Sequence, residues 1–172
     1  LYYNINKPVK ALGIFLETKN KISGINDPYL TEDVLFKTGL AYAGIDSFSK
    51  SNEVLNSALT ISESLSDAYY KTIITSELGY NAFKQNDLTG AERKINTALQ
   101  SARQNNLEQL AGVQNLYLGK IALEKNLLAR AENFFSISSQ IAESEKDYNN
   151  VFESQYFLAR TLVKQNKTAE AE

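Results

Sequence analysis

The stretch that decides the fold is LGYNAFKQNDLTGA, residues 78–91, because parts of it recur at a fixed interval along the 172 residues of the chain. Its glycine, Gly79, belongs to an evenly spaced series with Gly39, Gly119 and Ala159. The spacing in this series is 40 residues. The same spacing relates Asn86 to Asn6, Asp46, Asn126 and Asn166. It also relates Ala91 to Ala11, Ser51, Ala131 and Ala171. Self-similarity at this spacing is the signature of a repeat array, in which each unit packs on its neighbours.

Two sets of polar residues divide each 40-residue unit into two helices. Asp27, Asp67 and Asp147 stand where a carboxylate would accept hydrogen bonds from the free N–H groups of a helix start, and Leu107, preceded by Asn106, is the exception. Pro8 and Pro28 fit the first position of a helix. The series from Asn6 to Asn166 marks the turns at which one helix stops and the next begins.

Between these marks, apolar and small residues recur at spacings of three and four, as in Leu35, Thr38, Gly39 and Tyr42. The pattern predicts helices at 7–23, 29–45, 49–64, 68–84, 89–104, 108–125, 129–145 and 149–165, with a ninth beginning near 168. We therefore expect an all-α fold, a right-handed α-solenoid of antiparallel helix pairs. A single array would span 1–172, with a partial repeat at 1–26, complete repeats at 27–66, 67–106 and 107–146, and a partial repeat at 147–172.

The glycines inside the predicted helices indicate close helix packing. A glycine such as Gly79 in a helix interior costs about 1 kcal/mol relative to alanine. Its recurrence at Gly39 and Gly119 predicts crossings where two backbones approach and a larger side chain of the adjacent helix fills the space.

These residues resemble the tetratricopeptide repeat (TPR), whose signature is Leu-Gly-x-x-Tyr in the first helix and Ala-x-x-x-Phe in the second. The match is carried by Leu78-Gly79 with Ala91, Ile95 and Ala98, and by Leu118-Gly119 with Ala131 and Phe135. The usual repeat has about 34 residues, whereas this 40-residue unit is longer and has no tryptophan. In this it is similar to the TPR regions of bacterial signalling proteins, such as the sensor parts of two-component histidine kinases and of helix-turn-helix regulators of the maltose-activator type.

The composition excludes several classes of function. With no histidine and no cysteine, the chain cannot form a thiolate or imidazole zinc site, a Cys-His pair or a Ser-His-Asp triad. We expect no catalytic residues, no cofactor and no metal site. A net charge of -2 argues against a nucleic-acid partner, and no apolar run is long enough for a membrane segment. The absence of cysteine fits the bacterial cytoplasm and the periplasm equally.

The resemblance also implies a ligand-binding surface, the inner wall, formed by the first helix of each pair. Its members in this chain would be Phe36, Lys37, Leu40, Ile73, Glu77, Tyr80, Phe83, Val113, Tyr117, Lys120, Glu153, Tyr156, Phe157 and Arg160, together with Asp33, Ser76 and Leu116 at equivalent positions. Two interpretations remain open, because these residues form either a binding groove or part of a thicker core. The family's carboxylate clamp needs Lys and Asn where this chain has Phe36 and Leu40, which makes that ligand class improbable.

The leading hypothesis is a non-enzymatic module that binds a protein or peptide, as the sensing or interaction part of a larger bacterial signalling or transcriptional regulator. The alternatives are a structural scaffold or assembly adaptor that holds partners on its convex face, and an accessory domain of an enzyme. Lys37, Lys120 and Arg160 would favour an acidic ligand. Glu77 and Glu153 would instead favour a ligand that carries charges of both signs. We also expect further repeats in the native protein, and self-association through the open ends of the solenoid.

Overall fold

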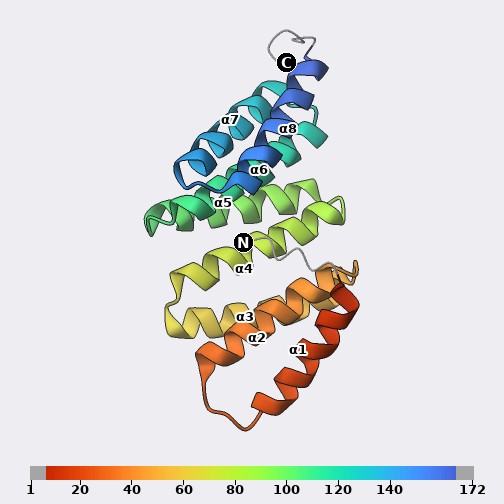
Figure 1. Ribbon diagram of the computed structural model, residues 1–172, viewed down its shortest axis with the longest axis vertical. Coiled ribbons are helices and arrows are strands. Elements are labelled where there is room, and N and C mark those ends of the chain that lie inside the picture. The colour runs from red at the N-terminus through yellow and green to blue at the C-terminus, as the bar shows by residue number, and fades with distance from the viewer. Residues whose placement is uncertain (1–6, 166–172) are drawn as a thin grey trace.

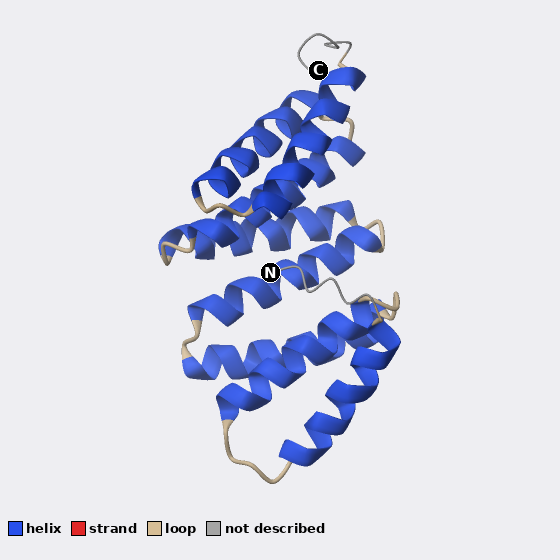
Figure 2. Ribbon diagram, in the orientation of Figure 1, coloured by secondary structure: helices blue, strands red, loops and turns tan. Residues whose placement is uncertain are grey.

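The computed structural model describes residues 7–165, and this part of the chain is entirely helical (Figure 2). Eight α-helices follow one another: α1 (Pro8–Ile22), α2 (Pro28–Ala43), α3 (Phe48–Leu65), α4 (Ala68–Lys84), α5 (Leu88–Gln104), α6 (Glu108–Glu124), α7 (Leu128–Ser144) and α8 (Tyr148–Lys164). Their first residues are evenly spaced in the sequence, and each repeat contains two helices. The predicted bounds agree closely with these, and the predicted ninth helix lies outside the described residues.

Aspartates cap four of the eight helices. Asp27, Asp67 and Asp147 accept hydrogen bonds from the backbone N–H three positions further along the chain, at 3.0, 2.9 and 3.2 Å, as the sequence predicted. Asp87 caps α5 in the same way, with the N–H of Gly90 at 2.8 Å. This cap was not predicted from the sequence. Leu107 precedes α6 without a side-chain cap.

The six turns from α2 to α8 share one backbone conformation, in which the second residue before the next helix has a positive φ. The turn between α1 and α2 does not have it. The residues in this position are Asp46, Ser66, Asn86, Asn106, Asn126 and Lys146, with φ between 54° and 63°. Asparagine and aspartate tolerate this left-handed conformation better than other non-glycine residues. This tolerance explains the predicted series of turn residues. Asn106 has the same conformation in the turn between α5 and α6.

The helices stack along the long axis of the molecule, with α1 at one end and α8 at the other (Figure 1). Each helix packs on the next along the chain. The first helices α2, α4, α6 and α8 also contact one another in sequence, whereas the second helices α1, α3, α5 and α7 make no such contact within residues 7–165. The structure is therefore closely packed along the inner wall and more open on the opposite side.

The helix crossings depend on three glycines. A Cβ built on Gly39 would lie 2.6 Å from the side chain of Leu55, and one on Gly79 would lie 2.6 Å from that of Ile95. At Gly119 the corresponding distance, to the ring of Phe135, is 2.5 Å. The three partners stand at the same sequence spacing from their glycines, and each is fully buried. The predicted packing role of these glycines is confirmed.

Ser51 stands where two other repeats have alanine, and the structure explains the difference. Its hydroxyl is buried and donates a hydrogen bond of 2.8 Å to the carbonyl of Gly39. It accepts another from the side-chain amide of Asn81, also at 2.8 Å. A polar contact thus joins α3 both to its partner α2 and to the next repeat.

Glu32, on α2, is a buried carboxyl in the described part of the chain that has no hydrogen-bond partner on either oxygen. Burial raises its pKa to about 7, and the negative charges of Asp67 and Asp33 add to this effect. The nearby Ser62 hydroxyl favours the charged form and so lowers the pKa, although it makes no hydrogen bond of normal geometry to Glu32. The folded chain therefore holds Glu32 in its neutral form more strongly than the unfolded chain does.

We predict that Gly79→Leu lowers the free energy of unfolding by at least about 2 kcal/mol, because the new side chain overlaps Ile95. The matched control is Gly13→Ala on α1, where nothing lies within 4 Å of the added Cβ; it should be neutral or stabilise by up to about 1 kcal/mol. Urea unfolding measures both. Equal effects from the two substitutions would show that Gly79 is not at a close crossing.

We predict that Glu32→Gln makes the protein more stable at pH 8 and changes little near pH 4.5. Because the pKa of Glu32 is higher in the folded chain, its protonation stabilises the fold fully below about pH 4.5. This stabilisation declines as the pH rises to about 7 and does not change further above that pH. The decline corresponds to roughly 3 kcal/mol. Urea unfolding at several pH values tests this, with the exposed Glu124→Gln as control. A difference between Glu32→Gln and wild type that is independent of pH would contradict it.

Candidate functional site

The predicted inner-wall residues all lie on first helices, at successive levels of the stack: α2, α4, α6 and α8. The structure places them at different depths. Phe36, Val113, Tyr117 and Lys120 are buried; Lys37, Leu40, Ile73, Glu77, Tyr80, Phe83, Glu153 and Phe157 are half-buried; Tyr156 and Arg160 are exposed. Ser76 and Leu116, at the equivalent wall positions, are buried as well. The wall therefore combines the two interpretations that the sequence left open, since its six buried members are packed as core.

The aromatic side chains of the wall contact one another across repeats. The ring of Tyr80 stacks on that of Tyr117 with centroids 4.8 Å apart, and the ring of Phe83 also stacks on Tyr80, at 6.1 Å. On α8, the guanidinium of Arg160 lies over the rings of Tyr156 and Phe157. The wall thus carries aromatic rings at each level from α4 to α8, with the Lys120 ammonium between those of Tyr117 and Phe157. Aromatic side chains of this kind anchor binding partners.

Two of the three cations that we expected to attract an acidic ligand are held by ion pairs within the protein. Lys37 lies 2.6 Å from the carboxylate of Asp33, and Lys120 lies 2.6 Å from that of Glu153. Lys120 is also only 9 % exposed. These pairs weaken the case for a purely acidic or phosphorylated ligand.

A small cavity, the inner cleft, opens between α2, α4 and α6. It is lined by Phe36, Ile73, Ser76, Glu77, Leu110, Val113 and Gln114, and its volume is about 30 Å³. Leu110 and Gln114 were not among the predicted wall residues. A signal for Gln114 was present in the sequence, because the equivalent positions in the two preceding repeats hold Ile74 and Val34, so that a polar side chain replaces a core one.

Two ionisable groups near the inner cleft have altered acidities. Burial raises the pKa of Glu77 to about 7. The pKa of Tyr80, one turn further along α4, is also raised, first by burial and then by the charges of Glu77 and Glu153. Glu77 consequently changes its charge close to neutral pH.

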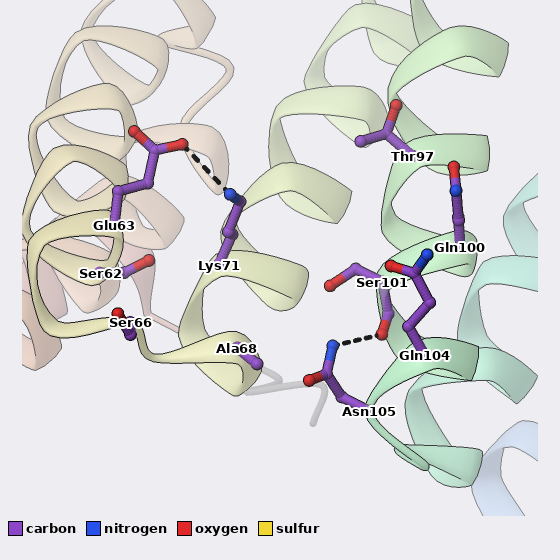
Figure 3. A pocket seen from close by; sticks show the side chains of 10 residues that line it. All are labelled: Ser62, Glu63, Ser66, Ala68, Lys71, Thr97, Gln100, Ser101, Gln104 and Asn105. Atoms are coloured by element: carbon purple, nitrogen blue, oxygen red, sulfur yellow. Dashed lines mark hydrogen bonds and ion pairs between the residues drawn. The ribbon is translucent and has the colours of Figure 1, made fainter.

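A larger cavity, the outer cleft, lies on the opposite side between α3, α4 and α5 (Figure 3). It has a volume of about 560 Å³ and is lined by Ser62, Glu63, Ser66, Ala68, Lys71, Thr97, Gln100, Ser101, Gln104 and Asn105. Lys71 and Glu63 pair across its edge at 3.5 Å, and both are largely exposed. The backbones of α3 and α5 do not approach each other closely, which leaves room for the cleft, and no pattern in the sequence predicted it.

Other types of site are not found in the described residues. No group of three or more acidic, histidine or cysteine side chains is placed to hold a metal ion within 7–165. None of the helices there is both long and apolar enough to cross a membrane.

Solved structures share this arrangement of helices. The Rap conjugation gene regulator of plasmid pLS20, in complex with the Phr* peptide, matches with a TM-score of 0.85 and 21 % identity over 96 % of this chain and 46 % of its own. The apo form of RapI matches at 0.81 with 17 % identity, over 96 % and 46 % of the two chains. MamA matches with a TM-score of 0.59 and 16 % identity, over 99 % of this chain and 92 % of its own. The fold is a TPR-like helical solenoid.

At these identities the likeness concerns the fold alone. The chain spans about half the length of each of the two Rap proteins. No protein-family model matches the sequence, and a search of curated proteins finds no similar one.

Proposed function

We propose that this chain is a non-enzymatic module that binds a peptide or a protein segment along its inner wall. It would act as the sensing or interaction part of a larger bacterial signalling or transcriptional regulator, with the whole chain forming a single array. The observation that carries the proposal is the series of aromatic rings on successive first helices, with Tyr80 half-buried over the core ring of Tyr117 and Tyr156 exposed on α8.

The physical basis is the parallel arrangement of the first helices. Side chains from α2, α4, α6 and α8 form rows across the wall, so an extended ligand can contact several repeats and gain affinity from many modest contacts. Tyrosine rings supply apolar area together with a polar tip. The peptide bound to the pLS20 Rap regulator is consistent with this use of the fold.

The second candidate function is a scaffold or assembly adaptor that holds a partner on the outer face. The outer cleft is the feature that favours it, because its hydroxyl and amide side chains offer hydrogen bonds to a polar partner surface. The two functions use opposite faces, so substitutions can separate them.

We predict that the protein selects binders from a displayed library of random 12-residue peptides, and that Tyr156→Ala weakens a selected synthetic peptide by about tenfold. Tyr156 is 51 % exposed, so its loss should leave stability nearly unchanged. Tyr117→Ala should instead reduce stability, because Tyr117 is 3 % exposed. Fluorescence anisotropy and urea unfolding provide the two measurements.

Two control variants complete the experiment. Tyr148→Ala removes a ring of the same type from α8 at a 76 % exposed position outside the wall, and it should not change affinity. Gln100→Arg alters the outer cleft. Selected peptides that lose affinity with Gln100→Arg and keep it with Tyr156→Ala would support the scaffold function and refute the inner-wall one.

A further inference from the structure

The inner cleft presents three oxygen acceptors that the protein itself does not fully use. Ser76 Oγ and Gln114 Oε1 are buried, with residue exposures of 3 % and 1 %, and neither has a hydrogen-bond partner. The carboxyl of Glu77 lines the same cavity. These groups come from α4 and α6, two successive first helices, so the repeat stacking itself brings them together.

The rest of the cleft cannot satisfy these acceptors, because Phe36, Ile73, Leu110 and Val113 offer only apolar atoms. A buried acceptor without a partner costs about 1–3 kcal/mol, and an ionised carboxylate costs more. This cost of burying the charged form raises the pKa of Glu77 to about 7. Such a cavity is improved by any ligand group that brings several N–H donors and a positive charge.

Glu77 is the only charged side chain among the described residues that line the cleft, and the charge of the chain's amino terminus lowers its pKa against the effect of burial. On α2, Lys37 is paired with Asp33, and Asp33 also accepts a hydrogen bond from the Tyr70 hydroxyl of α4. On α6, Lys120 is paired with Glu153 of α8. On α4 the nearest titrating neighbour is Tyr80, whose own pKa is raised. Neither lysine is therefore engaged with Glu77.

We propose that the inner cleft receives a primary ammonium group of the bound peptide, either a lysine side chain or a free amino terminus. The inference rests on the proposed function, and it specifies the chemistry that the wall recognises. An ammonium has three donors for the three acceptors of Ser76, Glu77 and Gln114. The acceptor atoms of Ser76 and Gln114 are closed to solvent in the free protein, so their side chains must rotate toward the cleft when the group enters. It is also close in size to a water molecule, which a cavity of about 30 Å³ admits, whereas a planar guanidinium is larger and brings five donors for three acceptors.

Binding of this group is linked to the ionisation of Glu77. The ammonium favours the carboxylate, so below pH 7 the complex must release a proton when it forms. Affinity is then highest between pH 7 and the pKa of the ammonium itself, which is about 8 for an amino terminus and about 10 for a lysine. It falls by up to about tenfold for each pH unit below 7. A purely apolar contact with the wall would show no such dependence.

The first experiment titrates the full chain with n-butylammonium chloride at pH 8 and follows the methyl NMR signals of Ile73, Leu110 and Val113. Two matched probes serve as controls: n-butanol has no charge, and n-butylguanidinium carries a larger cation. We expect shifts with butylammonium that saturate at lower concentration than with either control. Glu77→Gln should weaken binding by about tenfold or more, and the exposed Glu124→Gln should leave it unchanged.

Several outcomes overturn the inference. They are equal or tighter binding of butylguanidinium or butanol, unchanged affinity in Glu77→Gln, and equal butylammonium affinity at pH 6 and pH 8. Should Glu77→Gln fail to fold, Gln114→Leu replaces it, since this change removes one acceptor and keeps an apolar side chain of similar size.

A second experiment identifies the source of the ammonium and separates this inference from the proposed function. A library-selected peptide is compared with its N-acetylated form and with forms in which each lysine is replaced by norleucine. Loss of affinity in one form identifies the group that enters the cleft. Unchanged affinity in all forms refutes the ammonium site while the peptide-binding function stands; a library that gives no binder, with butylammonium still bound, refutes the function alone.

Discussion

The close crossing of each first helix with its second helix is the contact on which the other features depend. At Gly39, Gly79 and Gly119 the absence of a side chain lets a large residue of the partner helix lie against the backbone, where an added Cβ would be 2.5–2.6 Å away. Because the three crossings are alike and recur once in each repeat, each pair is placed on the next in the same way. This regular placement aligns α2, α4, α6 and α8 into one wall, and it leaves α3 and α5 separated on the opposite side (Figure 1).

Most of the fold could be predicted from the sequence because it depends on local chemistry. The caps at Asp27, Asp67 and Asp147 and the turns at Asp46, Asn86 and Asn126 act over short stretches of chain, so their spacing alone located the helices. The crossings could also be inferred, since a glycine within a helix is costly unless packing requires it.

The site was less predictable because it depends on contacts between repeats. The family resemblance named the wall positions, but it could not show that Tyr117 and Lys120 are covered by neighbouring helices. The pairing of Lys37 and Lys120 with Asp33 and Glu153, which weakens the expected preference for an acidic ligand, likewise requires the positions of adjacent side chains. Gln114 was not predicted, because its distance in sequence from Gly119 is not one of the wall positions. Only the comparison with Ile74 and Val34 in the preceding repeats marks it as unusual.

Two buried carboxyl groups illustrate how similar acidities arise from different environments. Glu32 and Glu77 both have a pKa raised to about 7, mainly by burial. Glu32 is completely enclosed, so its neutral form is a feature of the folded core. Glu77 borders an open cleft with two unsatisfied acceptors, where an incoming group can reach it. Only the second arrangement is suited to recognition.

The central claim, that ligands bind along the inner wall, is tested most directly by locating a bound peptide. The chain has no cysteine, so a library-selected peptide can carry the only nitroxide label, attached through its own cysteine. The account predicts that paramagnetic broadening of amide signals is strongest on α4, α6 and α8 around Tyr80, Tyr117 and Tyr156. Broadening centred instead on α3 and α5 around Ser66, Gln100 and Ser101 would place the ligand on the outer face and contradict the account.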